Sequence, residues 1–142
     1  MSSYLEVTDE SGRAFMMRGI AGPVTMLNLL RFREIADYGP FPALDPGHPV
    51  SGRVAFDAYV AHTLPFLAAS GGELLFYGEG GPWLIGPVGE GWDAAMLVRQ
   101  SCVAAFIAFN ADQAYLAGIG HRSAALADSR LLPLAEGKRL QR

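Results

Sequence analysis

The sequence has few charged residues, one cysteine and three histidines, and each shortage excludes a class of protein. Charged residues make up 18% of the 142 residues, against roughly 25% in an average soluble domain. The lone Cys102 excludes an intramolecular disulfide and fits a reducing compartment. His48, His62 and His121 are far apart and have no carboxylates at metal-ligand spacing, so we expect neither a metal site nor a cofactor.

The chain also lacks the charge pattern and the long apolar run that nucleic-acid or membrane partners require. A net charge of −3 provides no attractive field for nucleic acid, and the basic tail of Lys138, Arg139 and Arg142 is too short to change this. The start, Met-Ser-Ser-Tyr-Leu-Glu, lacks the basic and apolar regions of a signal peptide. No charge-free stretch offers the roughly 20 apolar residues of a membrane span. We therefore expect a cytoplasmic protein.

What the chain has in abundance is hydrophobic residues, which make up 51% of it. A chain of this length has room for one domain with one core, and we assign residues 1–142 to it, with a helical extension at 1–22 and a Pro/Gly-rich insert at 33–52. The insert has the length of a lid or of a rigid segment over a subunit interface. So few charges on so small a domain indicate apolar surface covered by a second subunit, so we expect a homodimer.

The order of turn signals, caps and apolar runs predicts the secondary structure. Gly71-Gly72 separates the main helix from a strand, and Asp112 begins the last helical segment. The predicted elements are a helix from Thr8 to about Gly19, a buried strand at 24–32, a helix at 53–70, strands at 73–79 and 92–99 with a short edge segment at 83–85 between them, a helix capped by Ser101, a second helical segment from Asp112 towards Ala127, and a strand at 129–134.

This strand-helix-strand order, which occurs twice, predicts a ferredoxin-like α+β fold. Right-handed connections in both units give a four-stranded antiparallel sheet with helices on one face. The other face then needs a cover. If that face carries Met26, Leu30 and their neighbours, a second sheet packed against it is the simplest solution.

An ordered set of short motifs follows the predicted elements along the chain. It consists of Phe56-Asp57-Ala58-Tyr59, Gly71-Gly72, Ala104-Ala105-Phe106, Asn110, Tyr115, Arg122 and Asp128-Ser129-Arg130. This set resembles the domain-of-unknown-function family 1330 of the dimeric α+β barrel superfamily. The resemblance covers about residues 23–135 and implies ferredoxin-like subunits that pair their sheets into a barrel, while the family implies no particular reaction. The N-terminal helix and the insert depart from the family's shorter pattern.

Several polar residues are candidates for chemistry. Asn28 lies in an apolar strand on the face shared with Met26 and Leu30, where it fixes the strand or contacts a ligand. His62, at the edge of the main helix's apolar face, is a structural histidine or a general base. His121 and Arg122 follow a Gly-Ile-Gly turn, and the guanidinium suits either a carboxylate ligand or a structural ion pair. For Cys102 we favour a buried, inert thiol.

These residues support three hypotheses. The first is a homodimer that binds a small apolar or aromatic, possibly carboxylate-bearing, molecule between sheet and helices, through Asn28, Tyr59, His62 and Arg122. The second, by analogy of fold, is a cofactor-independent enzyme resembling monooxygenases or isomerases, with His62 or His121 as the base and Arg122 as anion stabiliser. The third is a structural or interaction protein with a filled interior.

Overall fold

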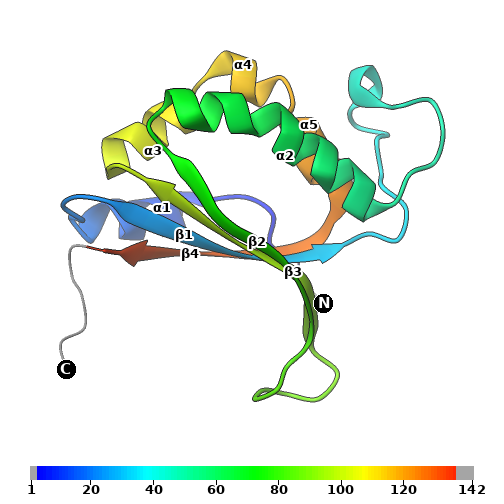
Figure 1. Ribbon diagram of the computed structural model, residues 1–142, viewed down its shortest axis with the longest axis horizontal. Helices are drawn as coiled ribbons and strands as arrows, with labels where there is room; N and C mark the ends of the chain where they lie inside the picture. The colour runs from blue at the N-terminus through cyan, green and yellow to red at the C-terminus, as the bar shows by residue number, and fades with distance from the viewer. Residues whose placement is uncertain (1–2, 137–142) are drawn as a thin grey trace.

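The computed structural model describes residues 3–136, which form one four-stranded antiparallel sheet with helices above it (Figure 1). The strand order is β2-β3-β1-β4. The strands are β1 (Val24–Phe32), β2 (Glu73–Pro82), β3 (Gly91–Gln100) and β4 (Leu126–Ala135), and the helices are α1 (Asp9–Met17), the 3-10 turn η1 (Pro42–Leu44), α2 (Gly52–Ala69), α3 (Val103–Asn110), α4 (Gln113–Leu116) and α5 (Ile119–Ala125). Strand order and helix placement confirm the predicted ferredoxin-like α+β fold. The basic tail with Lys138, Arg139 and Arg142 lies outside the described residues.

Two of the three predicted helix caps are confirmed. The Thr8 hydroxyl accepts the backbone N–H of Ser11, and the Ser11 hydroxyl accepts that of Thr8, each at 3.0 Å, which is a capping box. Asp112 accepts the N–H of Ala114 at the start of α4. The prediction of Ser101 as a cap is wrong. Because β3 continues to Gln100, the helix starts later, and the Cys102 sulfur accepts the N–H of Ala105 at 3.4 Å.

Two further predicted boundaries differ from the structure. The edge segment at 83–85 is not a strand, because β2 and β3 pair until Pro82 meets Gly91 and leave no strand partner for the turn between them. The helical segment predicted from Asp112 towards Ala127 is two short helices joined at Gly118. It ends at Ala125 because β4 begins at Leu126, three residues earlier than predicted.

The sheet has one covered and one open face. Met26, Asn28 and Leu30 of β1 are buried towards the helices, so the condition under which Met26 and Leu30 would need a second sheet as cover is not met. Side chains alternate along a strand, so Leu27 and Leu29 lie on the open face. There one apolar row crosses all four strands and consists of Phe76, Leu97, Leu27 and Leu132.

The two additions to the βαββαβ frame pack against different elements. In α1, Phe15 meets Phe106 of α3 edge to face with ring centroids 5.9 Å apart, and Arg18, just after the helix, donates to the Pro133 carbonyl of β4 at 2.7 Å. Helix α1 therefore closes the side of the helix layer next to the edge strand β4. The insert instead packs on α5, where a side chain at Gly120 would overlap Phe41 and Leu44 of the insert.

Candidate functional site

A cavity of about 1040 Å³ lies between the covered face of the sheet and the helices. Its floor comes from all four strands, with β2 contributing Leu74, and its roof comes from α2. The segment of α3 to α5 forms one end, and residues 4–7 with α1 form a side wall. The lining is mostly apolar, with a few hydrogen-bonding groups. This is the composition of a small-molecule site.

Helix α2 directs Tyr59, Thr63 and Leu67 into the cavity, because residues four apart lie on one helix face. The helix begins where the Ser51 hydroxyl accepts the N–H of Val54 at 3.1 Å. All three side chains are more than nine-tenths buried. Helical spacing thus brings two hydroxyl-bearing side chains of α2 to the roof of the cavity.

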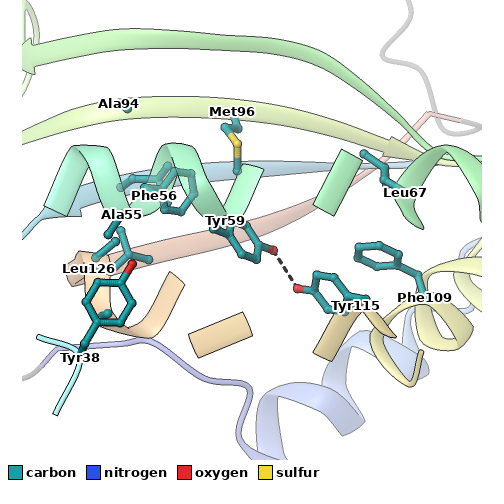
Figure 2. Packing of buried hydrophobic residues seen from close by; sticks show 13 residues of the cluster. Tyr38, Ala55, Phe56, Tyr59, Leu67, Ala94, Met96, Phe109, Tyr115 and Leu126 are labelled. Atoms are coloured by element: carbon teal, nitrogen blue, oxygen red, sulfur yellow. Dashed lines mark hydrogen bonds between the residues drawn. The ribbon is translucent and has the colours of Figure 1, made fainter. Parts of the chain in front are cut away.

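Two tyrosine hydroxyls meet inside the helix layer, where Tyr59 of α2 lies 2.7 Å from Tyr115 of α4, oxygen to oxygen (Figure 2). Tyr115 also packs on Phe109, with ring centroids 4.3 Å apart. Burial, followed by the neighbouring Tyr59, raises the pKa of Tyr115 well above 10, against a smaller lowering by Arg122. Tyr115 is therefore neutral at physiological pH. The two hydroxyls share one hydrogen bond, so one of their two protons is left to donate elsewhere.

Arg122 of α5 lines the cavity and has no acidic partner among the described residues. Its guanidinium donates to the Leu5 carbonyl at 3.0 Å and reaches the Ser129 hydroxyl at 3.5 Å. In contrast, Arg130 lies 2.8 Å from Asp128. Burial raises the pKa of Asp128, but hydrogen bonds from the Tyr4 N–H and from Arg130 outweigh this and leave that pKa below its usual value. Arg122 therefore retains a positive charge that no described carboxylate balances.

Asn28 is in the floor of the cavity, as its alternation with Met26 and Leu30 predicts. Its amide nitrogen donates to the Met26 carbonyl at 3.2 Å, and it is 8% exposed. That bond uses one of the four hydrogen-bonding positions of the carboxamide. The side chain therefore has both donor and acceptor capacity left towards the cavity.

His62 packs on the outside of this arrangement and is not part of the cavity lining. Its Nε2 donates to the carbonyls of Ala114 at 3.0 Å and Tyr115 at 3.2 Å, which are in α4. A side chain at Gly118 would overlap the imidazole. His62 thus holds the backbone of α4 and, through it, the position of the Tyr115 ring.

His121, the other predicted base, is also outside the cavity lining. Its Nδ1 lies 2.7 Å from the Tyr38 hydroxyl and connects the insert to α5. Burial, followed by the nearby His62, lowers the pKa of His121 below its usual 6.5. Residues 33–52 contribute nothing to the cavity wall.

The structure thus brings Asn28, Tyr59 and Arg122 together at one cavity and places both histidines elsewhere. Two lining residues were missed as candidates, Thr63 and Tyr115. Thr63 had a sequence signal, because it follows Tyr59 by one helical turn. Tyr115 had none of that kind, since its place opposite Tyr59 depends on how α4 packs on α2. Within residues 3–136, no three metal-ligating side chains form a group. None of the described helices, α2 included, combines the length and hydropathy needed to traverse a bilayer.

Fold and site together define a ferredoxin-like α+β protein with a mainly apolar interior cavity. A protein of unknown function from Rhodopseudomonas palustris, RPA0582, is 32% identical over 97% of this chain and 100% of its own, with a TM-score of 0.81. The structure of methylated RPA0582 aligns with a TM-score of 0.81 and 33% identity over 99% of this chain and 98% of that one. The chain therefore belongs to the same family as RPA0582.

More distant similarity extends only to the fold. A protein of unknown function from Bacteroides fragilis, described as dimeric and ferredoxin-like, is 12% identical over 82% of this chain and 98% of its own, with a TM-score of 0.51. No protein-family model matches the chain, and no curated protein does.

Proposed function

We propose that this protein is a homodimer that binds a small, largely apolar or aromatic molecule with a carboxylate group in the cavity between sheet and helices. The observation that carries the proposal is the cavity itself. About 1040 Å³ is just above the roughly 300–1,000 Å³ usual for ligand pockets. A cavity of this size argues against the alternative of a structural protein with a filled interior.

Charge on the cavity wall supports an acidic ligand. The charged lining residues are Arg18, Arg122, Arg130 and Glu6. Arg130 is paired with Asp128, whereas Arg122 contacts only a carbonyl and a hydroxyl. A carboxylate matches the fork of N–H donors that a guanidinium presents. The spare hydroxyl proton of the Tyr59–Tyr115 pair provides a further donor.

The open face of the sheet supports the homodimer. Phe76 and Leu132, at the two ends of the apolar row, are 56% and 53% exposed. Leu84, Ile85 and Val88 at the β2–β3 turn are almost wholly exposed, and the turn extends away from the helices (Figure 1). Contiguous apolar surface of this kind marks an interface, and the Bacteroides fragilis protein of similar fold is described as dimeric.

We also propose that the chain belongs to the domain-of-unknown-function family 1330. The motifs on which this resemblance depends occur on the elements that the family pattern implies. Tyr59 lies on α2, Gly71-Gly72 precedes β2, Arg122 lies on α5, and Ser129 and Arg130 lie on β4.

No observation favours the enzyme hypothesis in the same way. His62 donates to two carbonyls of α4, and His121 is paired with Tyr38. Neither lies in the cavity wall. A general base must come within hydrogen-bond reach of the proton it removes, so a ligand in this cavity would meet no histidine.

Calorimetric titration with straight-chain and aryl-substituted carboxylic acids, each beside its primary amide, tests the proposal. We expect an acid such as octanoate to bind about 10- to 100-fold more tightly than octanamide, because hydrogen bonds to a charged group exceed neutral ones. Arg122→Gln should remove that difference. Arg18→Gln is the matched control, since Arg18 also lines the cavity and donates to a carbonyl. Equal losses in both variants, or no binding by any acid, would contradict the proposal.

A further inference from the structure

Asn28 in the floor of the cavity has a carboxamide oxygen that no described residue uses. Its amide nitrogen donates to the Met26 carbonyl at 3.2 Å, and this is the one hydrogen bond that the side chain forms within residues 3–136. A backbone carbonyl only accepts, so the atom beside it is the nitrogen and the remaining atom is the oxygen. Asn28 therefore presents an unused acceptor, Oδ1, in the cavity wall.

This oxygen is open to the cavity and is not sealed inside the core. Among the described residues that are not exposed, the Thr63 hydroxyl oxygen is the side-chain polar atom with neither a partner nor accessible surface. The Asn28 oxygen also has no partner, so it retains accessible surface. Because Asn28 is 8% exposed and lies on the covered face of β1, that surface belongs to the cavity. A group that enters the cavity therefore reaches Oδ1.

An open acceptor in an apolar floor discriminates between ligands. The neighbours of Asn28 on the same face are all apolar, namely Met26 and Leu30 along β1, Met96 on β3 and Leu131 on β4. A ligand that covers a polar atom without bonding it loses the bond which that atom makes to water. Sites with a buried polar group accordingly reject ligands that leave it unpaired. Asn28 thus favours a ligand with a hydrogen-bond donor at this point.

The strand register places Asn28 relative to Arg122. Asn28 pairs with Leu131 of β4, and Ser129, two residues earlier on the same face, pairs with Leu30. Diagonal neighbours of this kind in an antiparallel pair are about 7–8 Å apart. The Ser129 hydroxyl is in turn 3.5 Å from the Arg122 guanidinium. A ligand with its carboxylate at Arg122 therefore reaches Asn28 several bonds further along its chain.

We infer that the Asn28 oxygen accepts a hydrogen bond from a hydroxyl group of the ligand, so that the preferred ligand is a hydroxy acid whose hydroxyl lies several bonds from its carboxylate. This inference rests on the proposed carboxylate binding in the same cavity and adds to it. A hydroxyl donates, whereas an oxo group only accepts. A hydroxyl on the carbon next to the carboxylate also donates, but it stays beside Arg122 and does not reach Asn28.

Calorimetric titration of the wild type compares octanoate with its monohydroxylated isomers and with the corresponding oxo acids. We expect at least one isomer with its hydroxyl in the far half of the chain to bind about 5- to 10-fold more tightly than octanoate, the range of one neutral hydrogen bond. The oxo acid substituted at the same carbon should bind no more tightly than octanoate, and neither should 2-hydroxyoctanoate.

Two variants assign the preference to Asn28. Asn28→Leu replaces the carboxamide with an apolar group of similar size and should remove the preference for the hydroxylated isomer while octanoate still binds. Met96→Leu is the matched control, because Met96 pairs with Asn28 from β3, lines the same floor and conserves its volume on replacement by leucine. It should retain the preference. Urea midpoints of the ligand-free variants establish that both fold, and the ligand comparison within the wild type is independent of either variant.

The outcomes separate the two proposals. If octanoate binds but no isomer hydroxylated in the far half is preferred, or if the oxo acid is preferred equally, the inference about Asn28 is wrong and carboxylate binding stands. The same conclusion follows if the preference persists in Asn28→Leu or is lost equally in Met96→Leu. If neither octanoate nor any isomer binds the wild type, carboxylate binding fails and the inference fails with it.

Discussion

Both faces of the four-stranded sheet carry apolar side chains, unlike the faces of an ordinary antiparallel sheet with one side in water. Such a sheet is apolar towards its core and polar outside. Here the strand β1 directs Asn28 inwards, between Met26 and Leu30, and directs Leu27 and Leu29 outwards. Inside, Asn28 lines a cavity, and outside, Leu27 belongs to the apolar row that crosses the sheet. In the function proposed above, the covered face binds a ligand and the open face binds a partner subunit.

The largest expected effect comes from a charge on the open face. Leu132→Lys places an ammonium group in the apolar row of the proposed interface, at its β4 end, once per copy. We expect the dissociation constant of the dimer to rise about 100-fold or more, since an unpaired charge buried between apolar surfaces costs several kcal/mol. Light scattering over a dilution series measures this as a fall in mass from two chains to one.

Val54→Lys is the control for this charge. Val54 is 53% exposed, as Leu132 is, but it lies on α2 rather than on the open face. Its lysine should leave the mass unchanged. A wild-type mass of one chain at all concentrations would show that the open face has no such partner, and the contrast between the two faces would lose its explanation.

Gly118→Ala acts on the helix side alone. The added methyl group overlaps the His62 ring, so His62 must leave the carbonyls of Ala114 and Tyr115. We expect the free energy of unfolding to fall by about 1–3 kcal/mol, as for other overpacked sites, with the mass of the dimer unchanged. Gly81→Ala, whose added carbon meets nothing within 4 Å, is the control in chemical denaturation. Equal stability of the two variants would show that His62 does not hold α4 in place.

Two substitutions in β1 exchange a polar and an apolar side chain between the two faces of the sheet and test the role of each face. Asn28→Leu makes the covered face apolar, and it should weaken octanoate binding several-fold while changing the free energy of unfolding by no more than about 1 kcal/mol. Leu29→Asn makes the reverse change on the open face and should weaken dimerisation but not octanoate binding. For both variants, titration calorimetry measures octanoate binding and light scattering measures dimerisation. The assignment of faces is wrong if each exchange affects both properties equally.

The smallest expected effect is a pH dependence confined to the helix layer. Because the pKa of His121 in the folded protein lies below 6.5, protonation favours the unfolded chain. The stability that neutral His121 contributes is therefore complete above pH 6.5 and is lost as the pH falls through the lowered pKa. We expect the urea midpoint to fall from about pH 7.5 to about pH 5.5 in wild type and to fall less in His121→Gln.

His48→Gln, at an exposed histidine of the insert, is the control. Its urea midpoint should change with pH as that of the wild type does. Asp128, whose pKa lies below 3.8, loses its contribution only at lower pH and does not overlap this window. If the urea midpoint of His121→Gln falls with pH as much as that of the wild type, the Tyr38–His121 contact is unimportant for stability in this pH range.

Much of the site was accessible from the sequence because it depends on local spacing. Alternation in β1 put Asn28 with Met26 and Leu30, and helical spacing put Tyr59 on the buried face of α2, both as the structure has them. Which face of β1 points towards the helices could not be predicted from the sequence. A strand pattern says which residues share a face, but not which of the two faces the helices cover.

The residues that sequence reasoning placed least well are those whose roles depend on contacts between distant elements. His62 had the spacing of a group at the edge of the cavity, yet the carbonyls of α4 draw its ring to the outside. Thr63, one position along, appeared only as part of an apolar stripe, and its unpaired hydroxyl is visible only once its neighbours are in place. A rotation of about 100° per residue around the helix separates these two environments.

The sequence by itself determined the βαββαβ order, the strand at 24–32 and the scarcity of charge, because caps, turns and residue periodicity are properties of neighbouring residues. Only the tertiary structure decided that Asn28, Tyr59, Thr63 and Arg122 line one cavity and that Leu27 and Leu132 lie side by side on the opposite face. The physical reason is that these contacts join segments up to about a hundred residues apart. Their geometry comes from how helices pack on the sheet, which no local pattern encodes.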